Sequence, residues 1–418
     1  MRYILCFLLL LPLAVWGQQP RTTALDMRVI QRMSIPQTGA EHLVSDSLLM
    51  KRLSQLRVAV VANQTSVVGR GQTHLVDTLV SRGIKVQKIF CPEHGFRGNK
   101  EAGASIKDGI DQATGILVVS LYGNNKKPTA DQLKGIDLML FDLQDVGCRF
   151  YTYISTLHYV MEACAENKIP VVVLDRPNPN IAYVEGPVLE ARHQSFVGMH
   201  PVPICYGMTI GEYAKMINGE HWLGMTSREG KWVKPSVLEC QLTVVPMRRY
   251  TRQTDYTFPV APSPNLPNAQ AIRMYPSLCL FEGTNISVGR GTEYPFQWVG
   301  APSFNRADMP DSLVLASFTP HPIAGVSEHP PFDGRLCRGL DLRQFTKGGF
   351  SPWVILYMYQ HSSKETFFLK NGFFDRLAGT SSLRQQIQNG LSSSEIEQSW
   401  QPALEEFKAV RQKYLIYQ

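Results

Sequence analysis

Short apolar runs alternate with segments of helical spacing between residues 57 and 177. The apolar runs predict buried strands, at residues 57–63, 85–90, 115–123, 136–147 and 169–177. The segments with apolar residues every three or four positions predict helices, at residues 73–83, 129–135 and 151–168. Strands that are apolar on both faces and alternate with helices are typical of a parallel sheet covered on both sides. The pattern therefore predicts an α/β domain with a Rossmann-like, mostly parallel sheet flanked by helices.

The pattern changes at residues 258–268, where four prolines stand within eleven residues. Proline fits neither a helix interior nor a central strand, so this segment predicts a structured loop that crosses between two domains. Beyond the loop, mixed patterns predict a smaller α+β domain. We expect the α/β domain to span residues 46–250 and the C-terminal domain to span residues 251–418.

The end of the chain, residues 403–417, again has helical spacing. On a helix, the apolar residues of this segment share one face, namely Leu404, Phe407, Val410, Tyr414 and Tyr417. We therefore expect a C-terminal helix that packs against the protein through these five side chains.

Residues 1–17 have the features of a secretory signal peptide. Arg2 precedes an apolar run, and Val15 and Gly17 are small enough for the −3 and −1 cleavage positions. The run is too short to cross a bilayer, and no later segment has the roughly 18 unbroken apolar residues that a span needs. Cys6 lies inside the run rather than after it, so we expect no lipid anchor. The prediction is a soluble, exported protein of the periplasm or the extracellular space, in which residues 18–45 form a lead-in segment.

The composition favours a globular chain without a nucleic-acid partner. Of 418 residues, 44% are hydrophobic and 18% charged, which argues against disorder. The net charge of +7 is modest for this length, and no run of Lys or Arg marks a nucleic-acid groove. Seven of the eight cysteines remain without Cys6, and their spacing has no CxxC and no zinc pattern. We expect buried free thiols, with one or two disulfides as the alternative.

The motifs of common cofactors are missing. Residues 61–71 contain Gly69 and Gly71 but not the third glycine of a dinucleotide fingerprint, and no G-K-[ST] follows the glycines near residue 290. His74, His94 and Glu93 are conceivable metal ligands, yet the sequence has no H-E-x-x-H motif. The serine-nucleophile motifs G-x-S-x-G and S-x-x-K are absent as well. We therefore expect neither a cofactor nor a metal.

Polar residues follow each of the predicted strands. They are Asn63, Gln64 and Thr65, then Glu93 and His94, Tyr122, Asp142, Gln144, Asp145 and Arg149, and finally Asp175, Arg176 and Asn178. The carboxyl ends of parallel strands lie along one edge of a sheet, where ligands bind. The succession predicts a site at this edge. Two other interpretations stay open: helix caps or loop hydrogen bonds, and ion pairs of Arg149 with Asp145 and of Arg176 with Asp175.

Glu93 is the strongest single candidate. It stands between Pro92 and Gly95, a poor place for a helix cap, and close to the apolar Phe90 and Phe96. Apolar surroundings favour the protonated form that a general acid needs. His94, its neighbour, is more often a structural hydrogen-bonding residue than a catalyst.

A second polar stretch lies at residues 281–296. Glu282, Asn285, Arg290 and Glu293 alternate there with glycines and aromatic residues. Glycines let the backbone approach a ligand, and aromatic rings offer flat faces for sugars. The alternative is a glycine-rich hairpin loop with ordinary ion pairs.

Several segments occur in the order found in one family. They are "CPEHGFRG", "FDLQDVGCRFYTYISTL", "VLDRPNP", "EGP", "PSPNLP", "YPSLCLFEGTNISVGRGTE", "FDRLAG" and "YLIY". By these segments the chain resembles the exo-β-N-acetylmuramidase family (NamZ, or YbbC-like), formerly a domain of unknown function. The resemblance covers nearly all of residues 50–418.

The resemblance implies a Rossmann-like domain and a smaller domain with the site between them, and release of N-acetylmuramic acid from the non-reducing end of peptidoglycan fragments. It also implies a catalytic glutamate and a nearby tyrosine, without nucleotide or metal. The glutamate of "PEHG" is Glu93, and for the tyrosine we favour Tyr153 over Tyr122 and Tyr151. The expected substrate-binding residues are Asn63, His94, Tyr122, Gln144, Asp145, Arg149, Tyr151, Arg176, Glu282, Asn285, Arg290 and Glu293.

The lactyl carboxylate of this substrate predicts a cationic partner, for which Arg149, Arg176 and Arg290 are the candidates. Two other functions stay open at this point. One is a cell-wall sugar-binding protein without turnover, and the other is a cell-wall esterase or amidase.

Overall fold

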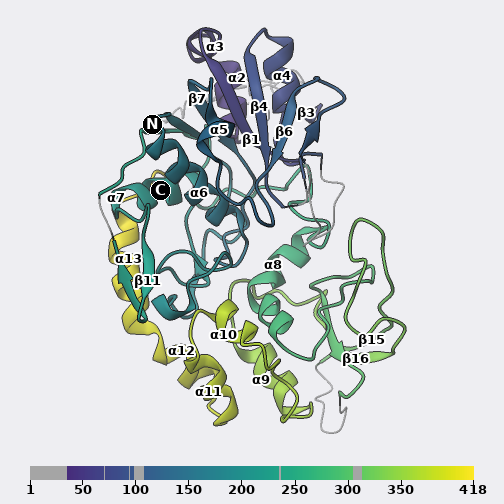
Figure 1. The fold of residues 1–418 in the computed structure, drawn as a ribbon. Helices are drawn as coiled ribbons and strands as arrows, with labels where there is room; N and C mark the ends of the chain where they lie inside the picture. The colour runs from purple at the N-terminus through teal and green to yellow at the C-terminus, as the bar shows by residue number, and fades with distance from the viewer. Residues whose placement is uncertain (1–34, 70, 94, 98–107, 235–236, 305–312) are drawn as a thin grey trace, which may run out of the picture. The chain divides into compact units, whose positions relative to one another are not determined.

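A computed structural model describes residues 35–69, 71–93, 95–97, 108–234, 237–304 and 313–418 (Figure 1). The predicted signal peptide, most of the lead-in segment and His94 lie outside the described residues. Residues 36–418 pack against one another as one unit. The domain boundary near residue 250 stays a prediction.

The predicted parallel sheet is confirmed. Its strands are β1 (Arg57–Ala62), β4 (Lys85–Cys91), β5 (Gly109–Ile110), β6 (Leu117–Ser120), β7 (Leu138–Asp142), β8 (Val171–Leu174) and β13 (Leu242–Val245). In the described part of the chain they form a seven-stranded sheet in the order β13-β8-β7-β1-β4-β6-β5. Neighbouring strands are parallel, except that the edge strand β5 is antiparallel to β6. The carboxyl ends of the five predicted strands therefore share one edge.

Helices cover both faces of this sheet. They are α2 (Gly39–Ser45), α3 (Ser47–Leu53), α4 (Leu75–Ser81), α5 (Ala130–Leu133), α6 (Tyr153–Glu166) and α7 (Ile210–Gly219). Successive residues of β1 point to opposite faces, so Val58 and Val60 pack with α2 and α4, whereas Ala59 and Val61 pack in the core that holds α6 and α7. Burial on both faces explains why these strands read as unbroken apolar runs.

Short paired strands and one 3₁₀ helix extend the α/β region. They are β2 (Val67–Val68) with β3 (Thr73–His74), β9 (Val184–Glu185) with β10 (Cys205–Tyr206), β11 (Thr226–Arg228) with β12 (Lys231–Val233), and η1 (Ala191–His193). Strand β3 takes up the first two residues of the helix predicted at 73–83, so α4 begins at Leu75.

The C-terminal region is smaller and mixes helices with an antiparallel sheet, as predicted. Its elements are α8 (Ala269–Leu278), η2 (Cys279–Gly283), β14 (Trp298–Ala301), β15 (Leu315–Phe318), β16 (Cys337–Asp341), α9 (Trp353–Gln360), α10 (Phe373–Ala378), α11 (Ser382–Gln388), α12 (Ser393–Ser399) and α13 (Gln401–Gln412). The sheet order is β14-β16-β15. Residues 258–268 contain neither helix nor strand and lead into α8, which confirms the predicted loop.

The predicted C-terminal helix is correct at its start and wrong at its end. Leu404 and Phe407 are buried on α13, but the helix ends at Gln412, so Tyr417 is not on its face. The tail beyond it returns to the α/β region (Figure 1), where the Tyr417 hydroxyl donates to Asp175 Oδ2 at 2.7 Å. Glu212 Oε1 accepts from the backbone nitrogens of Ile416 and Tyr417 at 2.8 and 3.2 Å. These bonds replace the helical ones that the sequence pattern predicted.

The cysteines among the described residues are buried and unpaired, as expected. They are Cys91, Cys148, Cys164, Cys205, Cys240, Cys279 and Cys337. Burial raises the pKa of the Cys91 and Cys240 thiols to about 12, so neither has the thiolate character of a nucleophile.

Candidate active site

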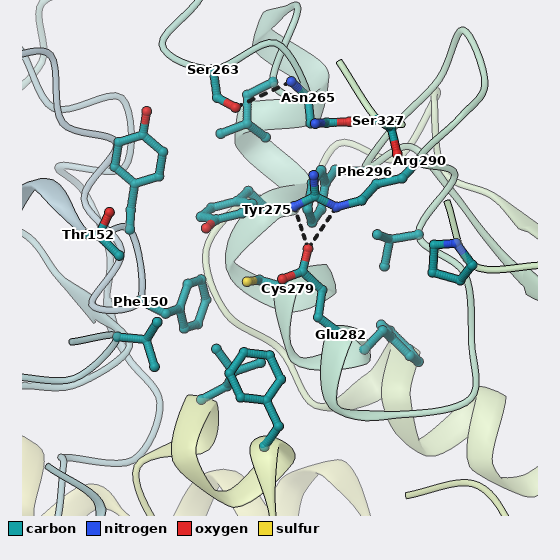
Figure 2. A pocket seen from close by; sticks show the side chains of 18 of the residues that line it. Phe150, Thr152, Ser263, Asn265, Tyr275, Cys279, Glu282, Arg290, Phe296 and Ser327 are labelled. Atoms are coloured by element: carbon teal, nitrogen blue, oxygen red, sulfur yellow. Dashed lines mark hydrogen bonds and ion pairs between the residues drawn. The ribbon is translucent and has the colours of Figure 1, made fainter. Parts of the chain in front are cut away.

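A cavity of about 810 Å³ lies against the carboxyl edge of the sheet. One wall comes from the residues that follow β4, β6 and β7, and the facing wall comes from α8, η2 and the segment after η2 (Figure 2). Candidate residues of the sequence that line it are Glu93, Tyr122, Tyr151, Tyr153, Glu282, Asn285 and Arg290. The cavity therefore brings together the two polar stretches that are nearly 200 residues apart in the sequence.

Glu93 stands two residues beyond the end of β4 and is half-buried in the cavity wall. Thr152, just before α6, donates its hydroxyl to Glu93 Oε2 at 3.4 Å. Burial, together with the charge of Glu93 and a hydrogen bond to it, raises the pKa of Tyr122. Tyr122 is thus a neutral phenol that donates to the Glu93 carboxylate. Two hydroxyl groups orient this carboxylate.

Tyr153 is the first residue of α6 and lies beside Glu93 in the same wall. Its hydroxyl accepts a 2.7 Å hydrogen bond from Asn63 Nδ2, at the carboxyl end of β1. Burial raises the pKa of Tyr153, and the charge of Glu93 acts in the same direction. The neighbouring Tyr151 packs edge-on against Tyr153 and donates its hydroxyl to the carbonyl of Pro262 at 2.8 Å. Asn63 therefore acts through Tyr153 rather than as a cavity-lining residue.

The facing wall carries an ion pair. Arg290 donates through Nε and Nη2 to Glu282 Oε1, at 2.9 and 2.5 Å (Figure 2). Its guanidinium also lies 5.1 Å from the centre of the Phe296 ring. Burial lowers the pKa of Arg290, but the charge of Glu282 outweighs it, and the net shift is upward. Arg290 therefore stays protonated. Its Nη1, which makes no bond to Glu282, is the part of this cation that a ligand in the cavity could bind.

The other two arginines lie away from the cavity. Arg149 is fully buried and donates to the carbonyls of Pro187, Val202, Leu377 and Ala378, at 2.6 to 3.0 Å. It thereby ties the region after β7 to α10.

Arg176 is 2% exposed and forms a buried ion pair, through Nε and Nη2, with both oxygens of Asp142 at 2.6 and 2.9 Å. Its predicted alternative partner, Asp175, instead accepts from Tyr417 and Thr209. Both arginines therefore make their side-chain hydrogen bonds within the protein.

The remaining candidates, apart from Asn285, lie behind the cavity or outside it. Gln144 donates to the carbonyls of Asp145 and Pro177 at 2.8 and 2.6 Å. The carboxylate of Asp145 is buried and accepts from the Tyr206 hydroxyl and from the backbone nitrogen of Gly147. Glu293 is exposed and does not line the cavity, whereas Asn285 lines it and donates to the carbonyl of Thr366.

Several residues that line the cavity were not among the candidates predicted from the sequence. Tyr275 on α8 packs against Tyr151 and Phe296, with ring centres 6.0 and 5.0 Å apart, and so joins the two walls. Asn265 comes from residues 258–268, where the prolines predicted a structured crossing loop but nothing marked the asparagine between them. No periodic pattern marks either residue. In the described ranges, no three His, Cys, Asp or Glu residues gather in a group that could hold a metal ion.

Comparison with known proteins identifies the family. Residues 58–270 match the model of the N-terminal domain of exo-β-N-acetylmuramidase NamZ, and residues 273–417 match that of its C-terminal domain. The chain belongs to the NamZ family. The peptidoglycan β-N-acetylmuramidase NamZ of Bacillus subtilis (strain 168) is 40% identical over 404 residues, which are 91% of each chain. The predicted family and the predicted enzyme class, a glycosidase, are thereby confirmed.

Two solved structures of the same architecture come from Bacteroides fragilis NCTC 9343, and both are described as DUF1343 family proteins. One is 40% identical, with a TM-score of 0.80, and the match covers 92% of this chain and 99% of the other. The second is 28% identical, with a TM-score of 0.75, and the match covers 93% and 100% of the two chains. The NamZ-family fold thus extends over nearly all of this chain.

Proposed function

We propose that this chain is an exo-acting β-N-acetylmuramidase that releases N-acetylmuramic acid from the non-reducing end of peptidoglycan fragments. The observation that carries the proposal is the Glu93 carboxylate, held by two hydroxyl groups in a cavity whose facing wall keeps a cation. A glycosidase needs a carboxyl group that protonates the departing oxygen. Membership of the NamZ family supports the choice of sugar.

Glu93 is the general acid in this proposal. Its position next to the strand end fixes the carboxyl group, and Tyr122 and Thr152 hold it toward the cavity. Tyr153 lies beside it and is kept neutral by burial. In this position, the phenol supplies a hydrogen bond to the sugar at the reacting side of the ring.

Arg290 is the partner of the lactyl carboxylate. Three arginines are candidates by sequence, but Arg149 and Arg176 are buried and already bonded within the protein. Arg290 alone of the three lines the cavity. An arginine can bind a carboxylate while it stays paired with Glu282, because a guanidinium has five donors.

We also infer that the protein is exported, because residues 1–17 have the charged start, apolar run and cleavage site of a signal peptide. Within the described residues, no helix is long and apolar enough to cross a membrane. Export would bring the enzyme to its polymer. Mass spectrometry of the mature N-terminus tests this, and a retained Met1 contradicts it.

Product analysis tests the activity. The purified protein is incubated with a disaccharide of N-acetylmuramic acid linked to N-acetylglucosamine, and the products are separated by liquid chromatography with mass detection. Free N-acetylmuramic acid is the expected product. Released peptide or acyl groups from muropeptides would instead indicate an amidase or esterase, and binding without any product would indicate a sugar-binding protein.

A further inference from the structure

The side-chain oxygen of one cavity-lining residue, Asn265, makes no hydrogen bond to any described residue. Asn265, in the loop at 258–268, is 1% exposed and lines the cavity. Its Nδ2 donates to the carbonyl of Val326 at 2.7 Å, and its backbone nitrogen donates to Ser263 Oγ at 3.3 Å. Its Oδ1 has no hydrogen-bond partner among the described residues. A buried amide oxygen of this kind is expected to have a donor.

The bond to Val326 fixes which end of the amide is available. A carbonyl oxygen only accepts, so the amide must present Nδ2 to Val326 and Oδ1 to the other side. Oδ1 can only accept a hydrogen bond. It therefore fits a group that donates, and among the groups of an N-acetylated sugar the amide N–H donates without accepting.

The neighbours of Asn265 fit the rest of an acetamido group. Leu266 and Val326, beside it in the cavity wall, are apolar, and so is Phe296, on the segment after η2 that also carries Arg290. Of these, Val326 is half-buried and offers apolar surface for an acetyl methyl group, while Leu266 and Phe296 are each 1% exposed. A hydroxyl group could also donate to this oxygen, but only an acetamido group combines a donor with a methyl group for the apolar side chains.

The position of Asn265 also fits the order of groups around the sugar ring. Figure 2 shows Asn265 and Arg290 on the same side of the cavity, with Ser327 beside them. In N-acetylmuramic acid the acetamido group is on C2 and the lactyl ether is on the adjacent C3. If Arg290 binds the lactyl carboxylate, the acceptor for the acetamido N–H belongs next to it.

We propose that Asn265 Oδ1 accepts a hydrogen bond from the N–H of the 2-acetamido group and so selects the N-acetylated sugar. The inference rests on the proposed function, because that function supplies the sugar. Asn265 has a structural role as well: through Val326 it holds the loop between β15 and β16, which contributes Ser327 and His329 to the cavity. The test must separate the two roles.

The experiment compares two aryl β-glycosides that carry the same lactyl group and the same leaving group. One has the natural 2-acetamido group, and the other has a 2-O-acetyl ester, which keeps the acetyl group and lacks only the N–H. The quantity measured is the ratio of kcat/KM for the amide to kcat/KM for the ester. We expect Asn265→Ala to lower this ratio about 10- to 100-fold relative to the unmodified protein, because one buried hydrogen bond is lost on the amide alone.

A purely structural role lowers both rates by the same factor and leaves the ratio unchanged, which overturns the proposal. Asn218→Ala is the matched control. Asn218 holds a loop through both ends of its amide, donating to the Cys240 carbonyl and accepting from the Cys240 nitrogen at 3.0 and 2.8 Å, and it does not line the cavity. Its ratio should equal that of the unmodified protein.

A binding measurement keeps the proposal testable if Asn265→Ala does not fold. Calorimetry with Glu93→Gln protein compares N-acetylmuramic acid with its 2-O-acetyl ester analogue. We expect Kd to be about tenfold or more larger for the ester, which means weaker binding. Equal affinities for the two sugars overturn the proposal. Preference for the amide without any turnover by the unmodified protein would refute the proposed activity while supporting the role of Asn265. Failure to bind either sugar overturns both.

Discussion

The side-chain amide of Asn63 donates a 2.7 Å hydrogen bond to the hydroxyl of Tyr153. Asn63 directly follows β1, the central strand of the sheet, and Tyr153 opens α6. The bond therefore fixes the phenol beside Glu93 from the buried carboxyl end of the central strand. Asn63 is a positioning residue, since it does not line the cavity itself.

This relationship predicts that the two residues act as a unit. Tyr153→Phe should lower kcat/KM about 10- to 100-fold, because the hydrogen bond of the phenol to the sugar is lost. Asn63→Leu should have a smaller effect, and the double variant should be no worse than Tyr153→Phe alone. Steady-state kinetics on an aryl β-muraminide measures all three.

The control for this series is Tyr213→Phe, which removes a buried hydroxyl that bonds His200 outside the cavity. It should change stability and leave kcat/KM close to that of the unmodified protein. Strictly additive losses for Asn63→Leu and Tyr153→Phe would contradict the coupling.

The sheet was predictable because strands that are buried on both faces are apolar at successive positions in the sequence. In β1, β7 and β8, the residues that face either of the two hydrophobic cores are apolar. The end of α13 was not predictable in this way. Tyr414 and Tyr417 continue the helical spacing, but Asp175 and Glu212, some 200 residues earlier, bind the tail beyond the end of the helix.

The site was predictable in outline for a similar reason. Parallel strands place their carboxyl ends together, so the polar residues there point to a common edge whatever the strand order is. The sequence could not rank Arg149, Arg176 and Arg290, because the acceptors of Arg149 come from Pro187, Val202 and α10. Such long-range contacts decide which arginine is left for a ligand.

Arg290→Met should reduce activity on muramic substrates far more than on the matching N-acetylglucosaminides. A hydrogen-bonded contact to the lactyl carboxylate corresponds to about 1.5–3 kcal/mol, roughly ten- to a hundredfold in kcat/KM. Arg343→Met is the control, since Arg343 pairs with Asp341 and does not line the cavity. Equal losses on both sugars for Arg290→Met remove the carboxylate clamp from the proposed function.

Arg149→Met should destabilise the protein strongly. Four carbonyl groups lose their donor, and the free energy of unfolding should fall by about 3 kcal/mol or more. Arg149→Lys should rescue little of it, because one ammonium cannot reach four carbonyls. Urea unfolding measures both variants against Arg57→Met, whose arginine forms an exposed pair with Asp137 and should matter much less. Similar midpoints for Arg57→Met and Arg149→Met would contradict the structural role.

Asp145 should make stability fall between pH 5 and pH 7.5. Burial raises the pKa of its carboxyl to about 6, above the ordinary 3.8 that applies after unfolding. The folded state therefore binds the proton more tightly, and its stabilising effect is complete below the unfolded pKa and lost as the pH rises through 6. The loss from pH 5 to pH 7.5 is roughly 1–2 kcal/mol.

The measurement is urea unfolding at several pH values for the unmodified protein and for Asp145→Asn. The variant has no charge to bury, so its stability should decline less over this range by the amount that Asp145 contributes. Parallel pH profiles for the two proteins would show that another group causes the decline. Asp175, whose pKa burial also raises to about 6, would then be the next residue to replace.

Glu93→Gln tests the central residue of the site. Glutamine keeps the shape of the side chain and accepts the hydrogen bonds of Thr152 and Tyr122, but it has no proton to give to the departing sugar oxygen. General acid catalysis contributes about 10²–10⁴-fold to a rate, so turnover of the natural disaccharide should fall by that order while the affinity for sugar is largely kept. The loss should shrink on aryl glycosides with an acidic leaving group, because these need little protonation. Near-normal turnover of the disaccharide by Glu93→Gln would exclude Glu93 as the acid, and Glu282, the other carboxylate among the described residues that line the cavity, would take its place.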